Sequence, residues 1–352
     1  DELMRVSEGI IRAAMRTWKD GRYEAERFVD NDGIDLDKPI RVHVVLEKKG
    51  DRISFDFTGS NDQTRGPANI RPPLVQAAMV YTLISQVDPT ITINSGLLKV
   101  AEVKLRKGSV LDPHFPAPVN TYMPTVTAVT EATVEAISNI VPECARADGC
   151  GSRSIIIGGR STRSGKGYVQ YEIVGGGTGG RAMMDGVSGT CSHQSTARIA
   201  PIEIVESEFP TRVKRFELIP DSGGPGAFRG GLGILREYEN LAEARFTIRS
   251  NKHFIAPRGV RKGSDGRCGR LTMHPDTKGA EILPSRYSDY PLMAGNIFRL
   301  ESPGGGGFGD PRKRDPQSVC HDVNEGYVSA KSAKQDYRVA LKKSKGAFIV
   351  DL

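Results

Sequence analysis

Short runs that alternate apolar and polar residues, separated by Gly- and Pro-rich turns, fill the sequence between residues 153 and 301. Alternation with a period of two is the pattern of β-strands that bury one face. No regular alternation of strands with helices accompanies these runs, although a parallel sheet needs such long crossovers. We therefore expect an α+β fold in which antiparallel sheets dominate the second half. The expected strands cover residues 153–157, 168–174, 213–219, 233–238, 245–248 and 297–300.

An amphipathic helix is expected at the start of the sequence. Apolar residues recur there every three or four positions between residues 2 and 18, which is the spacing of one helical face. Asp20 and Gly21 end the pattern. The expected apolar face consists of Leu3, Val6, Ile10, Ala14 and Trp18.

These patterns divide the sequence into three segments. We expect the three segments to form one continuous module. Residues 1–150 mix helices and strands, residues 151–310 are strand-rich, and residues 311–352 form a helical tail with two short helices. The other local patterns of the first segment are a β-hairpin at 42–57, helices at 73–87 and 126–140, and an ambiguous strand at 97–105.

Composition narrows the functional class. The 49 Lys and Arg residues exceed the 42 Asp and Glu residues, but they are spread along the chain, so we expect a solvated surface and no nucleic-acid partner.

No apolar run reaches the roughly 18 to 20 residues of a membrane span, so we expect a soluble protein. Five cysteines without a C-x-x-C pair suit a reducing compartment, and we expect the cytoplasm.

The glycine-rich segment 175–180 directly follows an expected strand and matches a G-x-G-x-x-G string. No helix of sufficient length follows it, so a dinucleotide-binding turn is not expected. Two alternatives remain open. Glycine lets a backbone approach a ligand and present N–H groups, which would make this a substrate loop, or the glycines form tight bends between strands. The candidate substrate-binding residues are Gly175, Gly176, Gly177 and Gly179.

His193 is the best candidate for acid/base chemistry, because it stands in a polar stretch and histidine titrates near neutral pH. Glu203 and Glu206 follow it and are further catalytic candidates, since two carboxylates near a histidine could polarise a substrate. In a strand they would point to opposite faces, so their cooperation requires a helix or a bend. The alternative is that they form ordinary ion pairs with Arg212 or Arg215.

Three blocks of sequence resemble one known family. Residues 303–311, read Pro-Gly-Gly-Gly-Gly-Phe-Gly-Asp-Pro, with the positions that follow them, resemble the carboxy-terminal signature of hydantoinase B/oxoprolinase. Residues 220–233 and 56–60 resemble two further blocks of that family. The resemblance spans essentially the whole chain. We expect the 303–311 loop to be structural, with its consecutive glycines adopting the positive φ angles that a β-carbon penalises.

The resemblance implies an enzyme subunit that works with a hydantoinase A-type partner in a hetero-oligomer. That partner, an actin-like ATPase chain, is expected to bind ATP and Mg and to phosphorylate the carbonyl oxygen of a small-molecule substrate. The expected reaction is ATP-dependent hydrolysis of a cyclic amide. A related branch of the family carboxylates acetone or acetophenone, which is the alternative reaction. A third possibility, from another class, is a non-catalytic scaffold subunit.

The resemblance also bears on metal and substrate. Family members carry roughly two hundred residues before the point that matches Asp1, and the residues that resemble metal ligands belong to that part. We therefore assign no metal ligand in this chain and expect a divalent metal in the preceding part. Asn120 is a further candidate for substrate binding; its segment, 118–124, departs from the small, Gly-rich sequence usual in the family.

Overall fold

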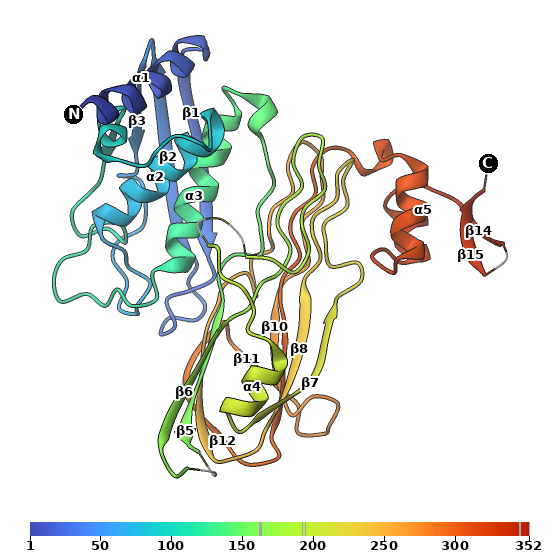
Figure 1. Ribbon diagram of the computed structural model, residues 1–352. Helices are drawn as coiled ribbons and strands as arrows, with labels where there is room; N and C mark the ends of the chain where they lie inside the picture. The colour runs from blue at the N-terminus through green and yellow to red at the C-terminus, as the bar shows by residue number, and fades with distance from the viewer. Residues whose placement is uncertain (162–163, 192, 194, 345, 352) are drawn as a thin grey trace. The chain divides into compact units, whose positions relative to one another are not determined.

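The chain folds into two compact units, Asp1–Arg146 and Ala147–Leu352, in the computed structural model (Figure 1). The structure describes residues 1–161, 164–191, 193, 195–344 and 346–351. Helices and antiparallel sheets together confirm the expected α+β class, with antiparallel strands dominating the second unit. In this described part of the chain, none of the helices combines the length and the apolar character needed to cross a membrane.

The first unit is a four-stranded sheet with helices packed on one face. Three neighbouring strands pair antiparallel and the last joins the sheet in parallel, in the order β1-β2-β3-β4. Helix α3 packs on β1 and β2, and α2 packs on α3. The expected hairpin and both expected helices are confirmed. The elements are β1 (Gly21–Val29), β2 (Ile40–Lys49), β3 (Arg52–Asp56), α2 (Pro72–Val87), η1 (Ser95–Lys99), β4 (Ala101–Lys104), α3 (Met123–Ser138) and η2 (Pro142–Cys144).

Helix α1 (Glu2–Thr17) forms where it was expected, but three of the five residues of its predicted apolar face are exposed. The side chains of Leu3, Val6 and Ile10 are exposed, whereas Ser7, Ile11 and Met15 are buried. The buried side of α1 is therefore not the predicted one. On the observed side of the helix, the guanidinium of Arg12 donates to the carbonyl oxygens of Asp51 and Lys99, each at 2.9 Å. Apolar residues lie on several sides of this helix, so periodicity alone could not select the buried side.

The second unit contains two antiparallel sheets that enclose one core. The sheet orders are β12-β9-β5-β6 and β11-β10-β13-β8-β7. Phe246 on one sheet and Phe298 on the other pack with their ring centroids 4.9 Å apart. The elements are β5 (Ser154–Arg160), β6 (Gly167–Ile173), α4 (Ile202–Glu208), β7 (Thr211–Leu218), β8 (Ile234–Asn240), β9 (Ala244–Arg249), β10 (Arg270–Met273), β11 (Glu281–Leu283), β12 (Arg286–Leu292) and β13 (Ile297–Glu301).

Glycine-rich connections of the second unit lie side by side and form what we call the glycine bundle: residues 147–151, 175–180, 222–233, 258–266 and 303–309 (Figure 1). Segment 303–309 exchanges main-chain hydrogen bonds with the other segments. The amide of Gly305 donates to Gly231 O, and that of Gly306 donates to Asp148 O, each at 2.9 Å. A β-carbon on Gly305 would overlap the carbonyl oxygen of Thr178. Contacts this close leave no room for side chains.

The positive φ angles expected for the glycines of 303–311 are wrong for most of that loop. Of its five glycines only Gly309 has a positive φ, 76°. The other four need glycine for a different reason, because a neighbouring backbone occupies the place of the β-carbon. At residues 304–307 glycine is therefore required by the close approach of neighbouring backbones and not by backbone conformation.

The carboxy-terminal part of the second unit contains the two short helices that were expected, and a hairpin that was not. They pack around a small core of their own that includes Val319 and Tyr337. The segments are η3 (Pro311–Lys313), α5 (Pro316–Asn324), α6 (Ala330–Gln335), β14 (Leu341–Ser344) and β15 (Ala347–Val350).

A buried ionic network fastens these helices to the glycine bundle. Arg314 donates to both carboxylate oxygens of Asp185, at 2.7 and 2.8 Å, and to Asp322 at 2.7 Å. Arg229 donates to the other oxygen of Asp322 at 3.1 Å. The hydrogen bond and charge of Asp185 help to hold the pKa of Arg314 above its ordinary value, even though burial opposes this. Two arginines and two aspartates thus neutralise one another within the protein.

Changing Asp322→Asn should loosen the carboxy-terminal helices. The substitution keeps the shape but removes a buried charge that pairs with two arginines, and we expect a loss of about 2 kcal/mol. Hydrogen exchange over residues 316–339 and chemical denaturation measure the effect. Glu325→Gln, an exposed change just after the same helix, is the matched control. Equal protection in both variants would show that the network does not anchor the tail.

Candidate functional site

The predicted substrate loop, Gly175–Gly180, lies inside the glycine bundle. Gly175, Gly176 and Gly177 are buried and Gly179 is half-buried. The amide of Gly176 donates to Thr190 O at 2.8 Å, and the amide of Gly177 donates to Pro303 O at 3.0 Å. Both amides are therefore already used by the protein in this conformation. The segment packs as one of several adjacent backbones, which differs from the tight bends that were the alternative.

His193 lies close in the chain to this loop. Thr190 and Gly176 form an antiparallel bridge, with amide-to-carbonyl distances of 2.8 Å in both directions, and His193 follows three positions later. Its side chain is half-buried. The structure thus brings Thr190, three positions before His193, to the glycine loop. A role in proton transfer remains a prediction.

Glu203 and Glu206 both belong to α4, which supplies the helix that their cooperation requires. Glu203 is exposed, and a carboxylate oxygen of Glu206 accepts a hydrogen bond from the Val213 amide at 2.9 Å. The alternative of ion pairs with Arg212 or Arg215 is wrong, because these arginines pair with other carboxylates. Arg212 lies 3.3 Å from Glu239, and Arg215 donates to Glu217 at 2.6 Å.

Asn120 belongs to the first unit, whereas the other candidates belong to the second. It is exposed, and its side-chain oxygen accepts a hydrogen bond from the Thr121 hydroxyl at 3.3 Å. The buried amide of Asn69 donates to Pro118 O at 3.0 Å and so ties down the segment that precedes Asn120. Contact with substrate remains a prediction for Asn120, as it does for the four glycines.

A buried polar cluster at the glycine bundle was missed in the sequence. Lys252 and Asp148 form an ion pair at 3.2 Å, with each side chain only 2% exposed. Arg153, completely buried, donates to Cys150 O at 2.5 Å and to the carbonyl oxygens of Val174 and Gly175 at 3.3 Å. The signal in the sequence was the polar run 249–253 directly after an apolar strand.

His253 belongs to this cluster and stays neutral. Burial and, next, the charge of Arg153 lower the pKa of His253 to about 3. Its Nε2 lies 3.1 Å from the hydroxyl oxygen of Ser250, which is itself completely buried. His253 itself is half-buried, and its contact with the buried Ser250 helps to position the polar cluster beside the glycine bundle.

The thiol and metal chemistry of the described residues is limited. Burial raises the pKa of the half-buried Cys191 thiol, which disfavours the nucleophilic thiolate. Within the described ranges, no three His, Cys, Asp or Glu side chains gather in a way that could hold a metal ion. These residues therefore do not fit a metal centre, and we derive no step through one.

The chain belongs to the hydantoinase B/oxoprolinase family, whose model matches residues 1–311. It is 33% identical to a putative D-/L-hydantoinase chain of the B type from Pseudomonas sp. (strain NS671), a match that covers 97% of this chain and 59% of that protein. It is 31% identical to 5-oxoprolinase 1 of Arabidopsis thaliana, over 81% of this chain and 21% of that protein. The chain thus spans less than two thirds of these relatives.

Two solved structures share the fold. An acetone carboxylase, in its nucleotide-free state, superposes with a TM-score of 0.83 at 20% identity and covers 98% of this chain and 53% of its own. An ATP-dependent caprolactamase from Pseudomonas jessenii superposes with a TM-score of 0.82 at 24% identity, covering 97% of this chain and 60% of its own. The chain therefore shares its fold with both of these structures.

Proposed function

We propose that this chain is a B-type subunit of an ATP-dependent enzyme that hydrolyses a cyclic amide. The observation that carries the proposal is the family match over residues 1–311, which includes the glycine bundle and the candidate residues His193, Glu203 and Glu206. The caprolactamase supports the hydrolytic reaction, since its name describes an ATP-dependent enzyme and its fold is shared. Five unpaired cysteines support a reducing compartment, and the proposal places the enzyme in the cytoplasm.

In the proposed division of labour, an A-type ATPase chain holds ATP and Mg and phosphorylates the carbonyl oxygen of the substrate. Phosphorylation of the amide oxygen makes the carbonyl carbon more electrophilic, so that water can add to it. The ring C–N bond then breaks and the nitrogen leaves as an amine, which gives an acyl phosphate. A second water hydrolyses the acyl phosphate to a carboxylate and inorganic phosphate. His193 would take a proton from the first water, and Glu203 or Glu206 would orient the imidazole or the water.

Carboxylation is the second candidate, because the chain shares its fold with an acetone carboxylase. Bicarbonate distinguishes the two reactions. The complex of this chain with its A-type partner is assayed for ATP consumption with lactams, hydantoins and ketones, with and without bicarbonate. ATP consumption with a lactam and no bicarbonate supports the hydrolase, whereas a requirement for ketone and bicarbonate supports the carboxylase. A complex that is inactive with every substrate, but needed for the stability of a third chain, would support the scaffold.

The isolated chain is expected not to bind Mg-ATP with useful affinity. It carries no Walker motif, and its G-x-G-x-x-G string lies in the glycine bundle with amides of Gly176 and Gly177 already engaged. Calorimetric titration of the isolated chain measures this. A dissociation constant in the low micromolar range would contradict the division of labour.

A further inference from the structure

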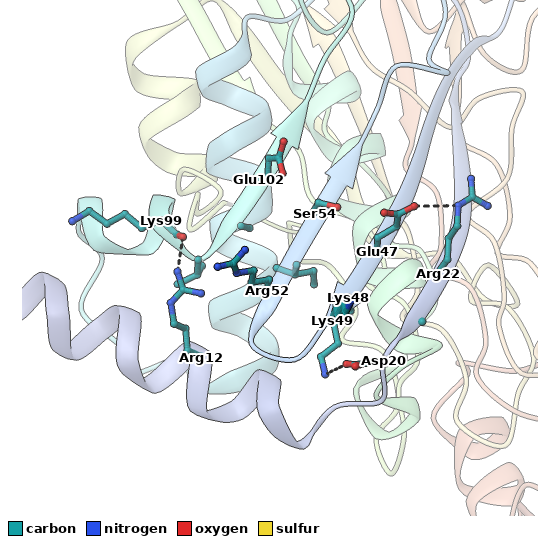
Figure 2. Close-up of a pocket in the computed structure, with 14 residues that line it drawn as sticks. Arg12, Asp20, Arg22, Glu47, Lys48, Lys49, Arg52, Ser54, Lys99 and Glu102 are labelled. Carbon is teal, nitrogen blue, oxygen red and sulfur yellow. Dashed lines mark hydrogen bonds and ion pairs between the residues drawn. The ribbon is translucent and has the colours of Figure 1, made fainter.

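A pocket of about 850 Å³ lies in the first unit between α1, the start of β1, the β2–β3 turn and the start of β4 (Figure 2). Its lining carries six basic side chains against three acidic ones, an excess of three positive charges. The basic residues are Arg12, Arg22, Lys48, Lys49, Arg52 and Lys99, and the acidic residues are Asp20, Glu47 and Glu102.

Half of these cations are already neutralised within the protein. Arg12 pairs with Glu8 at 2.8 Å, outside the lining, and Lys48 donates to Asp20 at 2.7 Å. Arg22 lies 3.5 Å from Glu47. These contacts hold α1 and the strands in place and form the walls of the pocket.

Lys49, Arg52 and Lys99 are the three cations left over. All three are exposed, and none makes a hydrogen bond or ion pair through its side chain to another described residue. Lys49 and Arg52 stand directly opposite each other in the β2–β3 register. Like charges in that position destabilise a hairpin, so folding alone does not explain this pair.

The wall of the pocket also contains an open sheet edge. Strand β4 is the last strand of its sheet and pairs only with β3 among the described strands. Ala101 and Glu102, the first two residues of β4, line the pocket, as does Val100 just before them. An exposed edge can accept one more extended chain through main-chain hydrogen bonds.

We propose that this pocket, together with the β4 edge, docks an extended acidic segment of a partner protein. The main chain of the segment pairs with β4, and its carboxylates meet Lys49, Arg52 and Lys99. A segment suits this surface better than a small anion, because the cations are long, exposed side chains spread around an open space (Figure 2). Several carboxylates along one segment match cations that come from three different elements, β2, β3 and η1.

The test uses the full chain and a fluorescently labelled peptide of alternating Glu and Thr, which places every carboxylate on one face of an extended strand. Fluorescence anisotropy should show binding that weakens as salt is raised. Lys49→Glu with Arg52→Glu should weaken it about tenfold or more. Lys331→Glu with Lys334→Glu, on exposed sites of α6, makes the same change in net charge and should leave binding within about twofold.

Folding and binding are separated by the single change Lys49→Glu. Opposite charges would then face each other in the hairpin, so the melting temperature should stay the same or rise while peptide binding falls. Equal binding by the pocket and α6 variants would overturn the proposal. Displacement of the peptide by inorganic phosphate at constant ionic strength would also overturn it, because the pocket would then be a site for small anions.

Discussion

Replacing Gly305 and Gly306 by alanine together is expected to prevent stable folding of the second unit. A β-carbon at the first position would overlap the Thr178 carbonyl oxygen, and one at the second would overlap the Arg258 carbonyl oxygen. Main chains packed on main chains cannot yield as a flexible side chain can. We expect about 3 kcal/mol or more at each position, which together approaches the whole stability of a typical domain.

Thermal and chemical denaturation, with assembly of the complex as a second readout, measure this effect. Gly9→Ala in α1 is the matched control, because nothing lies within 4 Å of its β-carbon position and alanine favours a helix. That variant should be as stable as wild type or slightly more stable. If the double variant melts and assembles like wild type but loses turnover, the 303–309 segment belongs to the active site instead.

Changing His193→Ala is expected to lower turnover of the assembled enzyme on the order of a hundredfold, the usual scale for losing a general acid or base. The fold should survive, because the side chain is half-buried and outside the three hydrophobic cores. ATP cleavage by the partner should continue while product formation falls. The two half-reactions would then be uncoupled.

Phosphate release and product release are measured side by side in the complex. His321→Ala, an exposed histidine on α5, is the control and should leave both rates unchanged. Unchanged rates for His193→Ala would remove this residue from the mechanism. Equal losses of both rates would instead indicate that His193 supports assembly or the phosphorylation step.

Elements with a strong local period could be predicted from the sequence. The β2–β3 hairpin, α2 and α3 lie close to their expected bounds, because alternation and helical spacing report burial directly. Weak or short patterns were missed. β1 carries charged residues at alternate positions, and β10, β11 and β12 lie between positions that read as turns. Their partners across the sheet stabilise them, and a local pattern does not contain those partners.

The candidate site was predicted only in part. The likeness of 303–311 to a known family indicated the family, and the polar stretch around His193 indicated a candidate. Neither revealed the ion pair of Lys252 with Asp148 or the contacts of the buried Arg153 with Val174 and Gly175, because these partners lie far apart in the chain. The ion pairs of Arg212 with Glu239 and of Arg215 with Glu217 also depend on the β7 strand and its pairing with β8, which the local sequence pattern does not show.

The sequence by itself determined the α+β class, the principal helices and strands, and the family, because each depends on a local pattern or on a contiguous motif. Only the tertiary structure decided which side of α1 is buried and why 303–309 requires glycine. It also decided which charges near Lys49 stay unpaired. These properties depend on atoms brought together from distant segments. A backbone at the place of a β-carbon, or a carboxylate beside a guanidinium, exists only after folding has placed the segments side by side.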